Sequence, residues 1–444
     1  MGRVRAVLVI RGDQGVRRAA MAAGEAGFAR ADVIFRPENA LRQIEVDTSF
    51  APVPYAARGR TPQLAMAATD EAEAFVVRCE VDEALMDGGG LPDNVEMFSD
   101  PAIASFSPIC GGDGPVGTAL DVGHNLGVAD LHRAGLDGTG VGLVICDTGI
   151  NSAHLAAKGL QPTLDTTFAW RPSGSFAGPG QSAVGHGTMC AFDALIAAPN
   201  ATLIDMPLLQ SQRIGGSGMD GVLSDAIAGY GQLLNLIRSG RYKHLVVNNS
   251  WGMYQLAWDF PAGHPGRYAD NPRHPFNIAV AVLARAGADI LFAAGNCGPA
   301  CPDGRCRQTD RFSITGANAH PDVTTVAAVS VRRTSIGYSS QGPGIPGMAS
   351  QKPDIAAYSH FLGSEAYGRG VADTGTSTAC PVAAGVVAAF RSHHAMASFS
   401  PSDLARELRY DAIARSSPAR WSPIRGYGII RPLDTARRLG LAGT

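Results

Sequence analysis

The second part of the chain alternates between short, continuously apolar runs and longer stretches in which apolar residues recur at helical spacing. Apolar runs that end at turn-forming residues predict strands buried on both faces, and such strands are typical of parallel sheets covered by helices. We therefore predict an α/β fold with a mostly parallel sheet. The predicted strands are 140–146, 202–208, 244–248, 289–293 and 323–330, and the predicted helices are 221–238, 276–286 and 377–393.

The first hundred or so residues follow a shorter pattern, in which brief apolar runs are separated by an Ala-rich stretch and by loops. This pattern predicts a small α/β domain before the larger one. A glycine-rich segment at 110–115 separates the two and is typical of a boundary or a cleavage segment. We therefore divide the chain into a small domain at 1–105, a linker or processing segment at 106–119 and a larger domain at 120–444. The predicted elements of the small domain are strands at 5–10, 32–36, 74–81 and 95–99 and a helix at 15–27.

Composition changes this picture little. The chain has 444 residues, of which 45% are hydrophobic and 17% are charged, and its formal net charge is −2. A balance so close to neutral argues against binding to nucleic acid or to an anionic membrane surface. The apolar run at 6–10 is shorter than the roughly 7–15 residues of a secretory leader, and no stretch reaches the about 20 apolar residues of a membrane-spanning helix. The sequence therefore predicts a soluble, cytoplasmic protein without nucleic-acid or membrane partners.

Three of the eight cysteines, Cys297, Cys301 and Cys306, lie close together in the sequence. Their spacing matches no standard zinc pattern, so three interpretations stay open: a structural metal site that lacks a fourth ligand, a loop disulfide with one free thiol, and three reduced thiols. The other five cysteines are scattered, mostly in apolar segments, where a buried cysteine acts as a small apolar side chain. The sequence otherwise indicates no required cofactor.

Candidate chemistry lies in three short segments at predicted strand ends and helix starts. Asp147 follows the first strand of the larger domain, His186 lies between two glycines before a helical stretch, and Ser377 opens a helix with Pro381 in its first turn. A serine hydroxyl becomes a good nucleophile when a histidine takes its proton and a buried carboxylate holds that histidine in the right tautomer. The free amide hydrogens at a helix start favour negative charge beside the serine. The three residues together therefore indicate nucleophilic catalysis.

Asn296 is a fourth candidate, because it follows the predicted strand 289–293 and carries an amide that can donate to a developing oxyanion. Taken singly, each of the four residues has an ordinary structural explanation. These explanations are a strand-end aspartate that caps a turn, a structural histidine, an N-cap serine and a turn asparagine. The combination is what favours a catalytic site.

These segments make the chain resemble the subtilisin-like serine protease family (the subtilases, peptidase family S8) over roughly residues 120–440. The resemblance implies a three-layer α/β fold with a mostly parallel sheet between helices, and a triad in the chain order Asp, His, Ser. By this resemblance, Asp147 orients His186, His186 is the general base and then the general acid, and Ser377 is the nucleophile. Asn296 and the Ser377 amide would form the oxyanion hole. The matching segments are Asp147-Thr148-Gly149-Ile150, His186-Gly187-Thr188, Asn249-Ser250-Trp251-Gly252, Ala293-Ala294-Gly295-Asn296 and Gly375-Thr376-Ser377-Thr378-Ala379-Cys380-Pro381.

The resemblance also implies a cleft in which a peptide substrate binds as an added strand. One edge of the cleft would be Gly216, Ser217 and Gly218, and the other would be Ser250, Trp251 and Gly252. Because these segments carry no acidic side chain, we expect an apolar or broad preference at P1, the residue before the cleaved bond. The residues expected to help line the P1 pocket are Ala293, Ala294 and Gly295.

In this family a small N-terminal propeptide with a ferredoxin-like fold often assists folding and then occupies the cleft as an intramolecular inhibitor. Residues 1–105 begin with a compatible strand–helix–strand pattern, and 95–106 would be the last strand leading to the cleft. The alternative is an ordinary N-terminal domain that stays attached.

The expected activity is that of a serine endopeptidase of limited specificity, which hydrolyses a peptide or protein partner through an acyl-enzyme. Two alternatives stay open. One is a peptide ligase or macrocyclase that passes the acyl group to an amine, and the other is an inactive module that keeps the peptide-binding cleft. All four catalytic positions hold competent residue types, which favours the active hydrolase.

Overall fold

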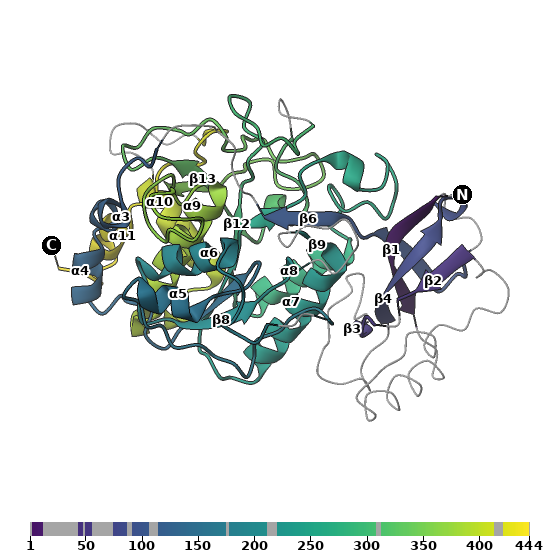
Figure 1. Cartoon of the computed structure of the whole chain (residues 1–444), viewed down its shortest axis with the longest axis horizontal. Helices are drawn as coiled ribbons and strands as arrows, with labels where there is room; N and C mark the ends of the chain where they lie inside the picture. Colours follow the sequence, from purple (N-terminus) through teal and green to yellow (C-terminus); the bar gives the residue numbers. More distant parts are fainter. Residues whose placement is uncertain are drawn as a thin grey trace.

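A parallel sheet of six strands forms the centre of the computed structural model (Figure 1). The predicted helix at 15–27, the predicted strand at 32–36 and the expected cleft residues Gly216, Ser217 and Gly218 lie outside the described residues. The structure describes residues 2–11, 43–47, 49–55, 74–86, 91–105, 114–174, 177–210, 220–307, 312–412 and 421–443.

The central sheet has the strand order β14-β13-β12-β10-β7-β8, and each neighbouring pair is parallel. The five strands predicted from apolar runs are confirmed to within a few residues, and β14 is an addition. Since the chain leaves β7 toward β8 but leaves β10 toward β12, its direction reverses between β7 and β10. Ligands of open α/β sheets bind outside the carboxyl ends of strands at such a point. The strands are β7 (Gly142–Cys146), β8 (Thr202–Met206), β10 (Leu245–Asn249), β12 (Asp289–Ala293), β13 (Thr324–Val329) and β14 (Ile355–Tyr358).

Helices cover both faces of this sheet, which gives the predicted three layers. Leu143 and Ile145 of β7 belong to an apolar cluster shared with α6 and α9, whereas Val144 and Cys146 belong to a second cluster shared with α7 and α8. All residues of α9 are buried, and this helix contacts five strands of the sheet. The covering helices are α6 (His186–Leu195), α7 (Leu223–Arg238), α8 (Pro275–Arg285) and α9 (Thr376–Arg391).

Shorter elements surround these layers. Among the described residues, no helix combines the length and the apolar character needed to cross a membrane. The remaining α-helices are α3 (Ala119–Leu126), α4 (Val128–Arg133), α5 (Ser152–Ala157), α10 (Pro401–Ala412) and α11 (Pro432–Arg438), and the 3-10 helices are η2 (Glu83–Leu85), η3 (Leu256–Trp258), η4 (Gly316–Ala319) and η5 (His394–Ser398).

The N-terminal part forms a separate antiparallel sheet, seen at the right of Figure 1; one face carries a small apolar cluster that includes Phe260 of the larger body, and the other face joins a cluster shared with that body. Its central strand β1 pairs with β4 and β5, and β4 also pairs with β2 and β3. Three of the strands predicted here are confirmed, with β5 matching its predicted range. The strands are β1 (Arg3–Arg11), β2 (Ile44–Val46), β3 (Val53–Tyr55), β4 (Ala74–Asp82) and β5 (Val95–Ser99).

The segment expected as one strand over 95–106 divides into β5 and β6 (Ala102–Ser105) at Asp100 and Pro101. The Asp100 carboxylate accepts hydrogen bonds from the amide and the hydroxyl of Ser224, both at 2.8 Å, and so caps the first turn of α7. Beyond this break β6 forms a third sheet with β9 (Asp220–Val222) and β11 (Trp251–Gly252). The chain therefore passes from the N-terminal sheet directly onto the larger body.

A buried ion pair fastens the end of α9 to the sheet. The Arg391 guanidinium donates to both carboxylate oxygens of Asp289, at 2.6 and 2.8 Å, and the two side chains are only 1% and 6% exposed. Arg391 also donates to the carbonyls of Met396 and Phe399. Four of the five N–H donors of the guanidinium are thus directed at acceptors.

We expect Arg391→Ala to lower the free energy of unfolding by about 3–5 kcal/mol, because it leaves the buried Asp289 carboxylate without its partner. Urea unfolding followed by tryptophan fluorescence measures this difference. Arg406→Ala is the matched control, since its ion pairs on α10 are exposed and contribute about 1 kcal/mol or less. Equal losses in the two variants would contradict the special role of the buried pair.

Candidate active site

The carboxylate of Asp147 and the imidazole of His186 form the central contact of the candidate site. Asp147 directly follows β7, His186 is the first residue of α6, and Asp147 Oδ1 lies 2.7 Å from His186 Nδ1. Both side chains are buried. A carboxylate at Nδ1 fixes the proton on that nitrogen and leaves Nε2 as the basic atom.

Glycine at position 187 permits this contact. A Cβ atom at Gly187 would lie 2.5 Å from the carbonyl oxygen of Gly149, so any larger residue would push α6 away from the loop that follows Asp147. The amide of Gly187 also donates to the Thr148 hydroxyl at 2.9 Å, which joins the same two segments. The small residues around His186 therefore set the distance between carboxylate and imidazole.

Ser377 is the second residue of α9 and is fully buried. It follows Gly375, whose φ of 90° lies in the region that favours glycine and turns the chain into the helix. The Ser377 hydroxyl donates to the Ser250 carbonyl at 3.1 Å, and the Ser250 hydroxyl donates to the Ser377 carbonyl at 3.0 Å. The start of α9 is thereby bound to the segment that follows β10.

One sulfur atom marks where the three candidate residues converge. Cys190 Sγ lies 3.5 Å from Asp147 Oδ2, 3.7 Å from His186 Nδ1 and 3.5 Å from the carbonyl oxygen of Ser377. Its position one helical turn after His186 is the sequence signal that could have distinguished it from the other scattered cysteines. In this conformation the Ser377 hydroxyl points to Ser250, and the buried His186 Nε2 makes no hydrogen bond with any described residue.

Asp147, His186 and Cys190 place three potential metal ligands within 4.8 Å of one another. The geometry of the cluster favours a different use of these atoms. Asp147 Oδ1 and His186 Nδ1 already bind each other, and burial raises the pKa of the Cys190 thiol well above its usual value. Because metals bind the thiolate, this thiol is a poor ligand; it instead donates to Asp147 Oδ2 and packs against the imidazole.

The amide of Asn296 is held in a defined orientation beside the start of α9. Its Oδ1 accepts hydrogen bonds from the Thr376 amide at 2.9 Å and from the Thr376 hydroxyl at 3.0 Å. These contacts leave the NH₂ end as the donor end of the group. The adjacent Gly295 amide donates to the same Thr376 hydroxyl at 3.0 Å. Ala293 ends β12, and Ala294 and Gly295 connect it to Asn296.

The cleft edge expected at Ser250, Trp251 and Gly252 is already paired with another strand of the same chain. Strand β11 pairs antiparallel with β6, with Trp251 opposite Ser105 and Gly252 opposite Ala104. On its other side β6 pairs with β9, which begins just after Gly216, Ser217 and Gly218, the other expected edge of the cleft. Ile103, Ala104 and Ser105 are buried in this arrangement.

The clustered cysteines are oxidised, and the metal alternative predicted for them is wrong. Cys297 and Cys306 form a disulfide with an S–S distance of 2.06 Å, and Cys301 is disulfide-bonded as well. Their sulfurs are therefore not thiolates that could bind a metal ion. The amide of Asp303 donates to the carbonyl of Asn296 at 2.9 Å, so the loop closed by this disulfide supports the backbone of the oxyanion candidate.

Two buried carboxyl groups meet beside the site. Asp193 of α6 faces Asp373, which accepts hydrogen bonds from the amide and hydroxyl of Ser364. Burial, and then the charge of Asp373, raise the pKa of Asp193 well above its usual value. Burial also raises the pKa of Asp373 to about 6, against the effect of the Ser364 hydrogen bonds. Both shifts favour the protonated form, most strongly for Asp193; Thr378 lowers the pKa of Asp193 and Lys158 lowers that of Asp373 against this trend.

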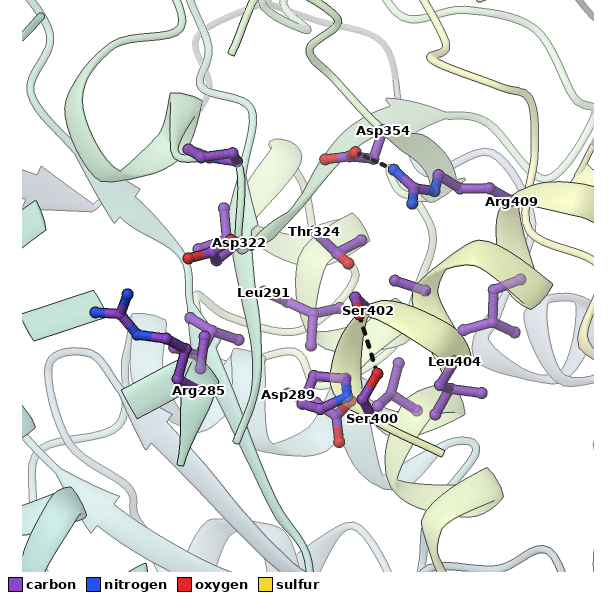
Figure 2. Close-up of a pocket in the computed structure, with 18 residues that line it drawn as sticks. Arg285, Asp289, Leu291, Asp322, Thr324, Asp354, Ser400, Ser402, Leu404 and Arg409 are labelled. Atoms are coloured by element: carbon purple, nitrogen blue, oxygen red, sulfur yellow. Dashed lines mark hydrogen bonds and ion pairs between the residues drawn. The ribbon is translucent and has the colours of Figure 1, made fainter. Parts of the chain in front are cut away.

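A pocket of about 290 Å³ lies at the amino ends of β12 and β13, at the end of the strands opposite to the candidate site (Figure 2). Its wall includes Arg409, which pairs with Asp354 at 3.1 Å and projects from α10. Since Asp147 and Ser250 lie at the carboxyl ends of β7 and β10, this pocket is separate from the candidate site.

Residues 138–428 match the family model of the subtilases, peptidase family S8. The match covers more than half of the chain, and the chain therefore belongs to the subtilase family, whose members are serine peptidases. Searching the curated proteins gives no match.

Two solved protease structures are similar to this chain. The MycP3 protease from the type VII (ESX-3) secretion system is 19% identical, with 76% of this chain and 92% of that chain covered and a TM-score of 0.50. Sphericase is 21% identical, with 66% of this chain and 92% of that chain covered and a TM-score of 0.47. At such low identity these likenesses concern the fold alone.

The raised pKa of the buried Asp193 carboxyl predicts a pH dependence of stability. In the unfolded chain Asp193 releases its proton near pH 4, whereas the folded protein keeps it to higher pH. As the pH rises from about 4 to the pKa of Asp193 in the folded protein, the wild type loses about 1.4 kcal/mol of unfolding free energy per pH unit from this group. Asp193→Asn removes this slope and keeps a donor toward Asp373, so its stability relative to wild type should rise with pH above about 4.

Urea unfolding at a series of pH values from about 4 to about 8 measures this difference. The exposed Asp93→Asn variant is the control and should leave the slope unchanged. A constant difference between Asp193→Asn and wild type across the series would show that Asp193 is ionised in the folded protein.

Proposed function

We propose that the protein is a serine endopeptidase that hydrolyses peptide bonds through an acyl-enzyme, with Asp147, His186 and Ser377 as its triad. The observation that carries this proposal is the buried 2.7 Å contact between Asp147 and His186 Nδ1, at the same place where α9 presents Ser377. A carboxylate in this position stabilises the imidazolium that forms when histidine takes the serine proton.

The first step requires the Ser377 hydroxyl to turn from the Ser250 carbonyl toward His186 Nε2. The buried Nε2 then accepts the proton as Oγ attacks the scissile carbonyl, and it returns the proton to the leaving amine. Water repeats the sequence on the acyl-enzyme and releases the second product. Catalytic hydrogen bonds are often long or unformed without substrate, so the orientation of Ser377 is compatible with this role.

Negative charge on the attacked carbonyl oxygen would be stabilised by the Asn296 side chain and the Ser377 amide. Thr376 holds Asn296 Oδ1 and so presents the NH₂ group as donor before any substrate binds. The amide of Ser377 belongs to the first turn of α9, where N–H groups lack intrahelical partners. Donors fixed in advance need no reorganisation during the reaction.

Peptide substrates would bind as a strand between β9 and β11, the place that β6 takes in this chain. In a peptide that binds in the register of β6, the residue after the one at the Ser105 position lies opposite Ser250, beside the nucleophile.

We further propose that residues 1–105 act as an intramolecular inhibitor, that 106–119 is a processing segment and that 120–444 is the catalytic domain. The capping of α7 by Asp100 and the pairing of β6 on both sides support the docked arrangement.

The natural target would be a peptide or protein partner with an apolar or broadly accepted P1 residue. The wall segments Ser250, Trp251, Gly252, Ala293, Ala294 and Gly295 carry no charge to demand a basic residue.

The disulfides at Cys297, Cys301 and Cys306 change the expectation of a cytoplasmic protein, because such bonds persist in oxidising compartments and are rare in the cytosol. We therefore place the activity in an oxidising environment rather than in the cytoplasm.

Intact mass spectrometry after treatment with a serine-directed fluorophosphonate tests the nucleophile and the processing together. We expect wild type to be cut after β6, within the segment 106–119, and to carry one label, whereas Ser377→Ala stays whole and unlabelled. A labelled but uncut wild type would show that the N-terminal domain is permanent. If the wild type stays unlabelled both with and without its N-terminal part, the catalytic assignment is overturned.

Asn296→Ala should lower kcat by about 10² to 10³ with a smaller change in KM, as loss of one oxyanion-hole donor does in an enzyme of this family. Steady-state hydrolysis of a peptide p-nitroanilide provides both constants. Circular dichroism checks that the variant is folded, since Thr376 also loses its acceptor. A variant with unchanged kcat would place the oxyanion elsewhere.

A further inference from the structure

The loop closed by the Cys297–Cys306 disulfide reaches from the oxyanion candidate to strand β6. The guanidinium of Arg305, next to Cys306, donates through Nη2 to the carbonyl oxygen of Ser105 at 3.1 Å. The hydroxyl of Tyr254 has two acceptors in reach, the same carbonyl oxygen at 2.9 Å and Asp303 Oδ2 at 3.2 Å, and the shorter contact is the one to Ser105. One main-chain carbonyl, opposite Trp251, thus receives two side-chain donors from outside its own sheet.

These donors are fixed by contacts of their own. The carboxylate of Asp303, which is completely buried, accepts Arg305 Nε at 3.0 Å and Nη2 at 2.9 Å. The Arg305 guanidinium also stacks over the Tyr254 ring at 3.9 Å from the centroid, and the same Nη2 lies 2.6 Å from the Tyr254 hydroxyl, so its two N–H groups are shared among three acceptors. The arginine is therefore held in place before a strand binds, and little side-chain entropy remains to be lost.

The contact recognises a position along the strand rather than a particular side chain. Both donors bind the main-chain oxygen of Ser105, whereas its hydroxyl is buried and makes no hydrogen bond with any described residue. Every peptide residue carries such a carbonyl, so a substrate strand in the same register would present the same acceptor. The buried surroundings of Ser105 leave room for a small side chain.

We propose that Arg305 and Tyr254 form a carbonyl-binding subsite for peptide substrates, which holds the residue that faces Trp251 and favours a small side chain there. This inference rests on the proposed peptidase function. The subsite binds substrate and takes no part in proton transfer. Because Asp303 also donates its amide to the Asn296 carbonyl, the loop couples the position of the bound strand to the oxyanion site.

A pair of substrates separates this role from a merely structural one. Acetyl-Ala-Ile-Ala-Ser-Phe-p-nitroanilide repeats the four residues of β6 and the Phe106 that follows them in the sequence, and it reaches the subsite, whereas acetyl-phenylalanine p-nitrophenyl ester is too short to reach it. A hydrogen bond from a charged donor corresponds to a loss of about tenfold to a hundredfold in kcat/KM. We expect this loss for Arg305→Ala on the pentapeptide, mainly in KM, with the ester unaffected.

Variants of the same region sharpen the comparison. Tyr254→Phe removes one donor and should lose less than Arg305→Ala, and Arg305→Lys should recover part of the loss. Arg307→Ala, an exposed arginine two residues further on, should change neither substrate. A pentapeptide with Leu in place of Ser should be a poorer substrate of wild type. An equal loss on pentapeptide and ester, or no loss on the pentapeptide, would overturn the proposal.

Hydrogen–deuterium exchange of the full chain tests the subsite without any catalysis. In a Ser377→Ala background, the β6 segment should exchange faster in Arg305→Ala than in Arg307→Ala. Unchanged exchange would show that Arg305 does not hold the strand. Failure of the proposed function is seen separately, as absence of fluorophosphonate labelling at Ser377 in the wild type.

Discussion

The buried contact between Asp147 and His186 is the constraint on which the arrangement of the site depends. A carboxylate without exposure to water is stable only when its oxygens are hydrogen-bonded. Oδ1 of Asp147 accepts hydrogen bonds from the Thr148 amide and the His186 imidazole, and Oδ2 accepts one from the Cys190 thiol. To provide the imidazole, the first turn of α6 must lie against the end of β7. The short distance between Gly187 and Gly149 is the direct result.

Close backbone packing is also needed between α6 and α9. A Cβ atom at Gly385 of α9 would lie 2.0 Å from the carbonyl oxygen of Ala194, so the two helices approach each other as closely as their backbones allow. Cys190 fills the space between the helix starts with one sulfur atom. Because both helices are packed this tightly, the distance between the imidazole and the serine is set by backbone contacts and not by long side chains.

Sequence patterns predicted the parts of this structure that depend on local signals. Five central strands follow from continuous apolar runs, and Asp147, His186 and Ser377 lie at a strand end and at two helix starts as expected. Strand β14 was missed because Ile-Ala-Ala-Tyr is too short to distinguish from a helix. The pairing of Asp193 with Asp373 and of Arg305 with Ser105 joins residues that are far apart in sequence, and no local pattern signals such contacts.

The disulfide loop shows why tertiary contacts can change a functional interpretation. From spacing alone, Cys297, Cys301 and Cys306 suggested chemistry of their own, either with a metal or as thiols. In the structure their bonds instead fix a loop whose first residue follows Asn296 and whose Arg305 donates to the Ser105 carbonyl of β6. Since a misplaced scissile carbonyl would lose the oxyanion donors, a loop that contacts both the strand and Asn296 can keep the two in register. Binding and catalysis would then depend on one rigid element.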